Sequence, residues 1–522
     1  MLLSRNILKT TTIGVLGLGT LASLRANDYD IGSIGIVRLG RAAITVFIIG
    51  SHYRNTLYKS NLDKTSSEYL ELKSKVHTFG AEKLLNLCCT NKGVYIKVGQ
   101  HLGSLDYLIP KEYIDTLKVL YSAAPESSFK DVLAVIQEDF KTDPYNIFES
   151  INPKPLGTAS LAQVHKAVLK SGETVAVKIQ HKSVKANSYT DIKTMAGLVW
   201  ITSIVFPEFK FEWLVDETKR NIPQELDFYG EGKNAEKVKN MFSAYQWLKV
   251  PKIYWNLTSS RVLTMEFLEG GQVNDLEYLN KYKINPFEIS NKLATLYSHM
   301  IFINGFVHSD PHPGNILVRK NNRETEVILL DHGLYAQLTD EFRCEYSKLW
   351  LAILEGNIPA IKLHSINLGV GDMYGLLACM VSGRSWNAIA TGVRKTKYTV
   401  HEKELFQKDV PNFLPQISSV LQRVNRQMLL ILRMNDLMRG VEYTLKTQQR
   451  MSAFLEMSRC CINSIYGDRL NNSVDRWSWW KLIFIQQWAL LKLSLYHMYL
   501  GITRFDLNQQ LETVWSNIYY FF

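Results

Sequence analysis

Three side chains in the middle of the chain have the types and spacing that phosphoryl transfer requires. Asp310 is followed five positions later by Asn315, and an Asp-x-Gly tripeptide begins at Asp331. A carboxylate in the first place can accept a hydroxyl proton, whereas an amide and a second carboxylate supply hard oxygen ligands for Mg²⁺. Kinase-like folds use this order to hold a base and magnesium ligands around one phosphate. These residues therefore predict a phosphoryl-transfer centre.

The residues between these groups predict the element that positions them. An isolated Asp-x-Gly is usually a turn, because both residues favour turns. Here residues 316–318 and 327–330 are apolar runs typical of buried strands, and Asn321-Asn322 lies at the place of the connecting turn. Such a hairpin would bring the carboxylates of Asp310 and Asp331 to one end.

Two histidines lie in the same run of sequence. His308 and His312 could each act as a ligand or base, or could serve as an orienting or core side chain. Their residue type leaves both interpretations open.

A kinase-like centre requires a nucleotide-binding lobe upstream, and the sequence predicts one. Residues 164–169 and 174–179 alternate as strands around a Ser-Gly turn, and Lys178 stands near the end of the second strand. A lysine there can reach the α and β phosphates if a helix carboxylate holds it in place. The small-residue loop at 156–160 precedes these strands, and its backbone N–H groups can approach phosphate closely.

Five separated motifs make the chain similar to the UbiB family of atypical kinases, also called aarF-domain-containing kinases. They are Lys97-Val98-Gly99-Gln100, the loop at 155–165, Glu225-Leu226-Asp227, the strand at 263–270, and the run at 308–315. The resemblance implies an α+β, bilobal protein-kinase-like fold with a small β-rich N-lobe and a mainly helical C-lobe. It also implies an N-terminal helical extension, a helical C-terminal flank, and ATP or ADP with Mg²⁺ as cofactors.

The resemblance implies a role for each motif residue. Lys178 and Glu231 would pair, Asp310 would act in catalysis, and Asn315 and Asp331 would bind the metal. The nucleotide would contact Leu156, Gly157, Thr158, Ala159, Ser160, Val164, Ala176, Lys178, Met265, Glu266, Phe267 and Leu268. In this loop Gly157 and Thr158 stand where alanines are usual in the family, so a preference between ADP and ATP does not carry over.

The extension motif has a functional and a simpler interpretation. By resemblance Lys97 and Gln100 belong to a helix that covers the place of a protein substrate, and Glu225, with Asp227 nearby, reaches toward Lys97. From the residues alone, Lys97 is a solvated lysine and the acidic run is a solvated helix face. Two glycines flank Glu231 and predict either a close approach or flexibility there.

The sequence after Asp331 bears on the acceptor. It passes almost at once into a helical pattern at 339–342, with no long activation segment and no Ala-Pro-Glu stretch. Protein kinases seat peptides on that segment. A small molecule, a lipid or water is therefore the expected acceptor. The alternatives are a pseudokinase scaffold that binds nucleotide without turnover and, less favoured, a serine/threonine protein kinase.

Composition agrees with a single large enzyme, and the motifs and the family resemblance divide it into six expected parts. Its 522 residues are 46% hydrophobic, and the six cysteines, two pairs of them adjacent, have no Cys-x-x-Cys metal spacing and predict reduced thiols. The expected parts are a targeting segment (1–27), an apolar and basic membrane-proximal segment (28–59), the extension (60–150), the N-lobe and hinge (151–270), the C-lobe (271–465) and a Trp-rich helical segment (466–522).

Both termini and the net charge of +11 predict a location at an anionic mitochondrial membrane, associated with the inner membrane. Residues 1–27 contain three basic and no acidic residues, as in a transit peptide, although a secretory signal is the rival. The apolar run at 42–50 is either an interfacial helix or part of a span. The Trp-rich segment either binds membrane or packs on the core. No nucleic-acid-binding module is recognisable, and nucleic acid is not an expected partner.

Overall fold

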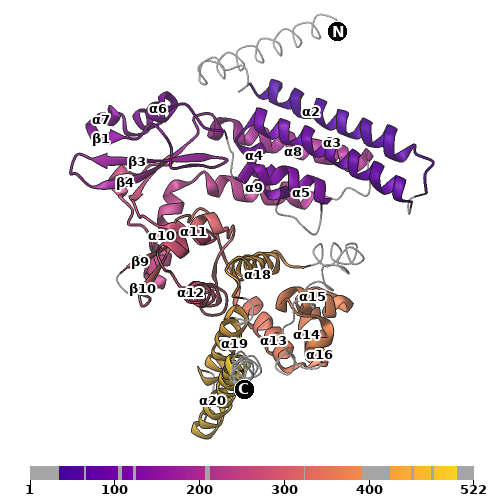
Figure 1. The fold of residues 1–522 in the computed structure, drawn as a ribbon, viewed down its shortest axis with the longest axis vertical. Helices are drawn as coiled ribbons and strands as arrows, with labels where there is room; N and C mark the ends of the chain where they lie inside the picture. The colour runs from indigo at the N-terminus through magenta and orange to yellow at the C-terminus, as the bar shows by residue number, and fades with distance from the viewer. Residues whose placement is uncertain are drawn as a thin grey trace, which may run out of the picture. The chain divides into compact units, whose positions relative to one another are not determined.

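The computed structural model describes residues 34–63, 66–103, 109–121, 125–205, 212–321, 324–390, 424–447, 452–471 and 475–502. The chain divides into two compact units (Figure 1). Unit 1 comprises Met1–Glu236 and Pro251–Phe267, and unit 2 comprises Lys237–Val250 and Leu268–Phe522. The chain thus passes from unit 1 to unit 2 and back, whereas the expected N-lobe at 151–270 was continuous.

The N-terminal extension of unit 1 is helical. Its elements are α2 (Gly35–His52), the π-helical η2 (Tyr53–Tyr58), α3 (Ser67–Asn91), α4 (Val94–Gly103), α5 (Lys111–Leu117) and the 3-10 helix η3 (Lys118–Tyr121). The Lys-x-Gly-Gln motif lies on α4. Its Gly99 is required by packing, because a Cβ there would lie 2.5 Å from Leu120 Cδ1 and 3.0 Å from Cys88 Sγ.

The β-rich part of unit 1 follows two helices, α6 (Phe129–Phe140) and α7 (Pro144–Ile147). Its strands are β1 (Phe148–Ile151), β2 (Gly157–Thr158), β3 (Ala162–Leu169), β4 (Thr174–Gln180) and β6 (Val262–Glu266). They form an antiparallel sheet in the order β1-β3-β4-β6, with β2 paired to β3. The two predicted strands are confirmed as β3 and β4. Gly172 in their turn has a φ of +86°, which favours glycine.

Three helices and a short turn complete unit 1. They are α8 (Val184–Val205), α9 (Glu212–Glu225), α10 (Phe228–Met241) as far as Glu236, and the 3-10 turn η4 (Trp255–Leu257). The last turn of α10 belongs to unit 2. A small apolar cluster joins α4 to the segment around α8 and α9, and its buried members are Val94, Leu161, Val184, Ile222 and Leu226. The extension is therefore packed directly onto the part of the chain that follows β4.

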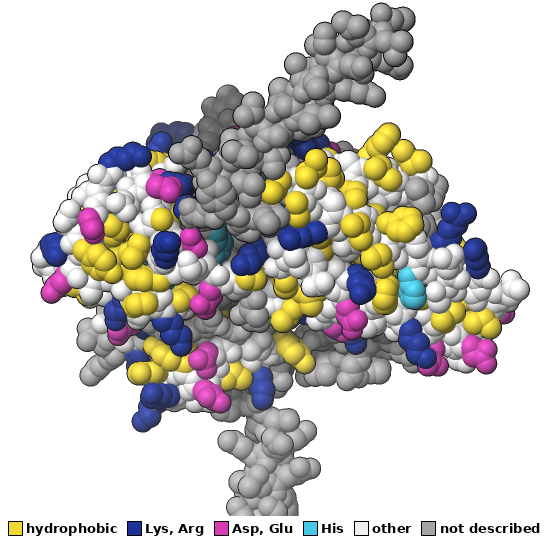
Figure 2. Space-filling model, turned by 90° about the horizontal axis from the view of Figure 1, so that it is seen from above, with side chains coloured by type: hydrophobic (Ala, Val, Ile, Leu, Met, Phe, Trp, Pro, Cys, Tyr) yellow, Lys and Arg dark blue, Asp and Glu magenta, His cyan; other side chains and the backbone are white. Residues whose placement is uncertain are grey.

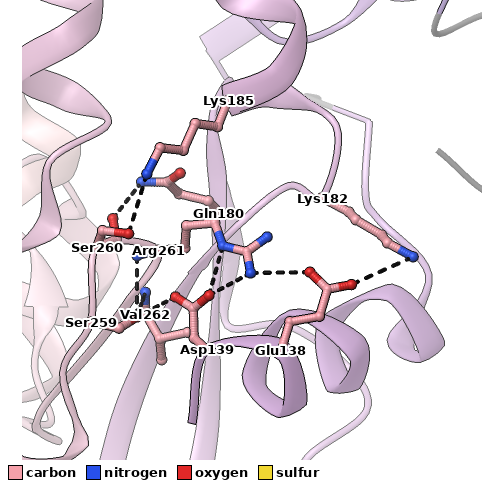
Figure 3. A network of polar contacts seen from close by, with 9 residues as sticks. All are labelled: Glu138, Asp139, Gln180, Lys182, Lys185, Ser259, Ser260, Arg261 and Val262. Carbon is pink, nitrogen blue, oxygen red and sulfur yellow. Dashed lines mark hydrogen bonds and ion pairs between the residues drawn. The ribbon is translucent and has the colours of Figure 1, made fainter. Parts of the chain in front are cut away.

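A polar network fastens the edge of the sheet to α6 (Figure 3). The Arg261 guanidinium, just before β6, donates to Asp139 on α6 at 2.8 Å and to Glu138 at 3.0 Å. Burial would raise the pKa of Asp139, but hydrogen bonds from Arg261 and Ser259 outweigh it and lower that pKa. From the end of β4, Gln180 Nε2 donates to the carbonyl groups of Leu226 and Ser260. The network holds β4 and β6 in register beside the α9–α10 junction.

Unit 2 combines two small sheets with helices. The first sheet has the order β5-β10-β9-β7, and the second pairs β11 with β8. These strands are β5 (Leu248–Lys249), β7 (Gly271–Gln272), β8 (Phe306–His308), β9 (Ile316–Asn321), β10 (Glu324–Leu329) and β11 (Tyr335–Gln337). The predicted hairpin is confirmed, since Ile316 pairs with Leu329 and Asn321 with Glu324. Asn321 ends β9, and Asn322 lies outside the described residues.

Helices make up most of the rest of unit 2. They are α11 (Leu276–Lys281), α12 (Pro286–Ser298), η5 (His299–Asn304), η6 (Pro313–Asn315), α13 (Asp340–Glu355), α14 (Ile358–Asn367), η7 (Gly371–Met373), α15 (Tyr374–Ser382), α16 (Trp386–Ala390), α18 (Arg426–Thr444), α19 (Ser452–Asn471) and α20 (Arg476–Ile502). The polar, basic sequence from Ser382 to Glu404 predicts a loop, which helix α16 interrupts. The part beyond residue 390 lies outside the described residues. The six cysteines, all within the described ranges, form no disulfide, in agreement with the expected reduced thiols.

Candidate active site

The predicted ion pair between β4 and α10 forms in unit 1. Lys178 Nζ donates to Glu231 Oε1 at 2.6 Å. The Glu231 side chain is 2% exposed and lies in the first turn of α10, where the helix dipole favours a carboxylate. The ring of Phe228 lies 5.3 Å from Lys178 Nζ and adds a cation–π contact. The lysine is thus held in one place at the end of its strand.

Glycines next to Glu231 permit the close packing that the sequence predicted. A Cβ on Gly232 would lie 2.7 Å from the Trp255 ring, and one on Gly230 would lie 2.8 Å from Asp227 Oδ2. The backbone carbonyl of Asp227 accepts the Glu231 N–H at 3.0 Å and so begins α10. Asp227 therefore shapes the junction from which Glu231 projects.

The extension helix α4 is joined to α9 by an ion pair and by a histidine–carboxylate contact. Lys97 Nζ lies 3.0 Å from Glu225 Oε2, which is the contact the motifs predicted. One turn later, His101 Nε2 lies 3.3 Å from Glu217 Oε2. The second pair was not predicted. The sequence indicates it only weakly, because Lys97 and His101 are four residues apart and so lie on one face of a helix.

Gln100, the other polar residue of the motif, contacts a different element from Lys97. Its Nε2 donates to the Leu120 carbonyl at 2.9 Å, and the Tyr121 hydroxyl donates to the Gln100 carbonyl at 2.6 Å. Gln100 thus ties α4 to η3 within the extension. Of the two polar residues of the motif, Lys97 is the one that contacts α9.

The small-residue loop is built on the start of the sheet. The Leu156 N–H donates to the Val164 carbonyl at 2.7 Å, and the Ala159 N–H donates to the Ala162 carbonyl at 2.8 Å. Ser160 is buried. Within the described part of the chain, the buried Thr158 Oγ1 has no hydrogen-bond partner. An unsatisfied hydroxyl in this place suits a phosphate oxygen as its acceptor.

A histidine that the sequence did not single out holds this loop. His181, just after β4, donates from Nε2 to the Ala159 carbonyl at 3.1 Å, and its Nδ1 accepts from the Ser127 hydroxyl at 2.7 Å. The Ser127 N–H in turn donates to Gln163 Oε1 at 2.9 Å. Burial lowers the pKa of His181, so the neutral ring that this pattern requires is favoured. The loop is thereby anchored to the linker that follows the extension.

The strand of the fourth motif, predicted to contact the nucleotide, lies at the edge of the sheet as β6. Its Met265 pairs with Ala176 of β4, and both residues are buried. The carboxylate of Glu266 accepts the Lys252 N–H at 3.2 Å, and Lys166 lies 4.4 Å from the ring of Phe267. The predicted nucleotide-lining residues of β4 and β6 are therefore neighbours in register.

In unit 2, the β9–β10 hairpin brings two of the predicted side chains together. Asn315 Nδ2 donates to Asp331 Oδ2 at 3.2 Å. The other carboxylate oxygen of Asp331 accepts the Gly333 N–H at 3.1 Å, so the Asp-x-Gly tripeptide is also a turn. The Asn315 N–H donates to the backbone carbonyl of His312, and the Asn315 carbonyl accepts the Leu330 N–H. The proximity of the Asp310 carboxylate to this pair stays a prediction.

Both histidines of the catalytic run have orienting contacts. The Asp310 N–H donates to His308 Nδ1 at 3.2 Å, so the proton of the neutral ring is on Nε2, which donates to the Asp331 carbonyl at 3.1 Å. His308 thus joins the Asp310 loop to the Asp331 turn. His312 Nδ1 accepts the Gly314 N–H at 3.0 Å and caps η6.

The donor set of Asn315 and Asp331 fits Mg²⁺. No group of three His, Cys, Asp or Glu side chains suitable for a metal occurs among the described residues. Mg²⁺ in nucleotide sites is usually held by one or two protein oxygens, with phosphates and water completing its shell. Bound there, Mg²⁺ would neutralise negative charge on phosphate oxygens. The pair is therefore suited to a metal that arrives with a nucleotide.

Comparison with known proteins places the chain in a family. A family model described as the ABC1 atypical kinase-like domain matches residues 119–365. AarF domain-containing kinase 1 of Drosophila melanogaster is 52% identical over 96% of this chain and 98% of its own length. AarF domain-containing protein kinase 1 of Mus musculus is 47% identical over 92% of this chain and 91% of its own length. The chain belongs to the ABC1/AarF family of atypical kinases, and its fold is α+β, bilobal and kinase-like.

One solved structure with partial similarity is that of Rv3197 from Mycobacterium tuberculosis with erythromycin. It covers 72% of this chain and 94% of its own, at 21% identity and a TM-score of 0.46.

Proposed function

We propose that the protein is an ATP-binding, Mg²⁺-dependent atypical kinase or ATPase at a mitochondrial membrane. It would transfer a phosphoryl group to a small molecule, a lipid or water, and so support lipid or coenzyme Q homeostasis. The observation that carries the proposal is the ion pair of Lys178 with the buried Glu231 at 2.6 Å. Such a pair holds the lysine where it can contact nucleotide phosphates. Burial of the two charges costs desolvation free energy that offsets much of their attraction, so a gain in stability alone does not account for the pair.

In the same proposal Asn315 and Asp331 hold Mg²⁺, and Asp310 faces the acceptor. The hydrogen bond between Asn315 and Asp331 supports the first role. The link through His308 supports the second, because it fixes the backbone at Asp310 relative to the Asp331 turn. The nucleotide would lie against the loop at 156–160 and the strands β4 and β6.

A non-protein acceptor is supported by the short segment after Asp331. Helix α13 begins at Asp340, and the intervening residues include β11, which pairs with β8. The Leu334 carbonyl accepts the Ser309 N–H at 2.9 Å, and the Leu338 N–H donates to the Gly305 carbonyl at 2.7 Å. The backbone of this segment thus forms hydrogen bonds within unit 2, so few of its groups remain to bind a peptide.

A membrane partner is supported by helix α20. It packs on α19, where Gln486 donates to Asn463, yet it exposes large apolar side chains on its other side. The most exposed of them are Trp477, Trp480, Phe484 and Trp488, at 50 to 87%. The helix has lysines and an arginine but no acidic residue. This combination suits an anionic bilayer interface.

Nucleotide binding and phosphate release with Mg²⁺ test the proposal. The full chain is compared with Lys178→Ala and Asp331→Asn, with and without anionic liposomes. Lys130→Ala and Asp372→Asn are matched controls, because both residues are exposed and lie on α6 and η7. We expect release that falls at least about tenfold in the two site variants and is unchanged in the controls.

Each outcome has a distinct meaning. Nucleotide binding without phosphate release in all conditions would contradict an enzyme and would favour a nucleotide-binding scaffold. Stoichiometric, Asp310-dependent phosphorylation of an added protein would replace the small acceptor by a peptide. Import into isolated mitochondria tests the location, and a chain left outside with residues 1–27 intact would contradict it.

A further inference from the structure

We propose that helices α2 and α8 form a docking face for the surface of an anionic phospholipid bilayer, and that α2 lies along this surface without crossing it. The face, called the α2–α8 face below, is defined by Ile36, Ile44, Phe47, Tyr189, Trp200 and Ile204. It lies on unit 1 and is separate from α20. The proposal extends the membrane location proposed above but does not depend on phosphoryl transfer.

The face consists of apolar side chains that the fold leaves uncovered. Phe47 is 74% exposed and Trp200 is 63% exposed, although both are bulky and apolar. The other four members are 60 to 66% exposed. Figure 2 views unit 1 from above, and hydrophobic side chains gather on it between lysines and arginines. Contiguous apolar surface of this kind marks a binding surface for a protein or a membrane.

Helix α2 is fastened to the rest of unit 1 at both ends. At its start, Arg38 and Asp191 of α8 form a bidentate ion pair with contacts of 2.6 and 2.8 Å, and both side chains are buried. Just beyond its end, the Tyr53 hydroxyl lies 2.6 Å from His77 Nδ1 of α3 and 3.2 Å from the Tyr113 hydroxyl of α5. Its inner side is therefore committed to the protein.

The neighbour of α2 decides against a span. The segment Gly35–Tyr58 is long and apolar enough to cross a membrane. However, α3 runs alongside it: the ring centroids of Phe79 and His52 lie 4.2 Å apart, and Asn91 Nδ2 donates to the Arg38 carbonyl. Between these contacts, α3 exposes Glu82 and Lys83. If α2 crossed the bilayer with this packing intact, those charges would enter the hydrocarbon, which is costly.

The charges around the α2–α8 face select an anionic partner. No acidic residue occurs from Gly35 to Tyr58, and the one acidic residue of α8 is Asp191, which Arg38 already neutralises. Arg54, Lys185 and Lys193 are exposed on the same two helical segments. Cations beside exposed aromatic and aliphatic side chains suit anionic headgroups above an apolar interface.

A shallow groove between the two helices adds to the fit. Its lining is mainly apolar and includes Leu39, Leu198 and Ile201, with Lys193 among the lining residues. Gly197 also lines it, and a Cβ there would meet no atom within 4 Å. Such a groove can take part of an acyl chain whose headgroup contacts Lys193.

The position of α2 relative to the bilayer can be measured in the full chain. A polarity-sensitive fluorophore is attached through Phe47→Cys or Trp200→Cys in a Cys89→Ser/Cys344→Ser background. Leu363→Cys, an exposed position on α14, is the matched control. The proteins are mixed with vesicles of phosphatidylcholine and phosphatidylglycerol that carry nitroxide quenchers either at the headgroup or deep in the acyl chain. Circular dichroism and melting first establish that each labelled protein is folded.

We expect both face probes to be quenched several-fold more by headgroup nitroxides than by deep ones, and the Leu363→Cys probe to be quenched by neither. With the Lys185→Glu/Lys193→Glu variant, or with vesicles of phosphatidylcholine alone, the vesicle concentration needed for the same quenching should rise about tenfold or more. Stronger deep quenching at Phe47→Cys would show that α2 crosses the bilayer and would overturn the proposal. No quenching at either face probe would also overturn it, and binding through α20 alone would then explain any sedimentation with vesicles. Nucleotide turnover is not needed in this assay, so its failure and that of the proposed enzyme are distinguishable.

Discussion

At the scale of single residues, the Lys178–Glu231 pair is energetically unusual because both charges lie inside unit 1. Their side chains are 17% and 2% exposed, and the contact is 2.6 Å. Removal of one partner leaves an uncompensated buried charge, which typically costs about 3 to 5 kcal/mol. Removal of both avoids that cost. The pair should therefore be strongly coupled.

We expect Lys178→Met and Glu231→Gln each to destabilise unit 1 by about 3 kcal/mol, and the double variant to be more stable than either single variant. Urea denaturation of the four proteins measures this cycle. Lys130→Met, on the exposed side of α6, is the control. Strictly additive losses would mean that the two charges are solvated separately in solution.

Thr158 offers a second test at this scale. Its Oγ1 is buried, and no partner for it occurs among the described residues, so the folded protein gains nothing from the hydroxyl. Thr158→Ala should leave stability within about 1 kcal/mol of the native chain. If the hydroxyl contacts phosphate, the same change should weaken nucleotide affinity about fivefold to tenfold. Titration calorimetry with ATP and with ADP measures both affinities.

Gly157→Ala is the matched control in the same loop. A Cβ at this position would meet no atom within 4 Å, so the substitution fits without displacement. It should change affinity less than Thr158→Ala does. An equal effect of both substitutions would indicate that loop conformation, and not the Thr158 hydroxyl, determines affinity.

The sequence predicted the paired charged residues of this site better than it predicted the residues that hold the phosphate loop and the helices in place. Lys178–Glu231 and Lys97–Glu225 followed from motifs whose chemistry requires a partner. His181 and Ser127 did not, because a histidine and a serine at unrelated positions acquire meaning only when the fold brings them to Ala159. The same holds for Arg38 and Asp191, which are 153 positions apart. Such contacts are set by tertiary packing and leave no local pattern.

At the scale of elements, two side-chain contacts with carboxylates help to hold α4 on α9. Lys97–Glu225 belongs to the family motif, whereas His101–Glu217 lies one turn further along. All four side chains are 13 to 20% exposed. Partly buried pairs of this kind contribute about 1 kcal/mol each, which is about fivefold in a local opening equilibrium.

Glu217→Gln should therefore accelerate amide hydrogen exchange in α4 about fivefold, and Glu217→Gln/Lys97→Ala should accelerate it further. Exchange read out by mass spectrometry on α4 and α9 peptides tests this expectation. Glu82→Gln, at an exposed site of α3, is the control and should leave α4 unchanged. If α4 in Glu217→Gln exchanges its amide hydrogens at the native rate, then Lys97 and apolar packing hold α4 without a contribution from Glu217.

Periodicity predicted the elements more reliably than their ends. The strands at 164–169, 174–179 and 316–318 recur in β3, β4 and β9, because alternation and apolar runs report burial directly. The loop expected from 382 onward contains α16, whose five residues are too few for periodicity to reveal. The acidic run around Glu225 divides into α9 and α10 because backbone capping at Asp227 restarts the helix.

At the scale of the whole molecule, motif order predicted the kinase-like fold, but it did not predict how the chain is shared between the units. Residues Lys237–Val250 belong to unit 2, where β5 pairs in parallel with β10. A strand of two residues carries no readable signal of its partner. The proposed docking face of α2 and α8 was equally hidden in the sequence. Apolar residues at 42–50 were recognisable, but only the packing of α2 on α3 and α8 shows which of its sides remains exposed.

Stability against pH offers a test on the whole molecule, through the buried Glu442 of α18. Its carboxylate accepts the Ala453 N–H at 3.0 Å and so contacts the first turn of α19. Burial raises the pKa of Glu442 from 4.5 to about 7, although the Ala453 N–H and Arg439 oppose this. The folded protein thus binds this proton more tightly than the unfolded chain does. Its contribution is fully present below pH 4.5 and is lost as the pH rises through about 7.

Glu442→Gln keeps the acceptor and removes the titration. The native protein should therefore lose roughly 2 to 3 kcal/mol of unfolding free energy relative to Glu442→Gln as the pH rises from 5 to 8. Calorimetric melting at several pH values measures the difference between the two proteins. Asp372→Asn, at an exposed site of unit 2, should follow the native curve throughout. If native and Glu442→Gln curves remain parallel, the carboxylate is already ionised at pH 5, and solvent or a cation must reach it between α18 and α19.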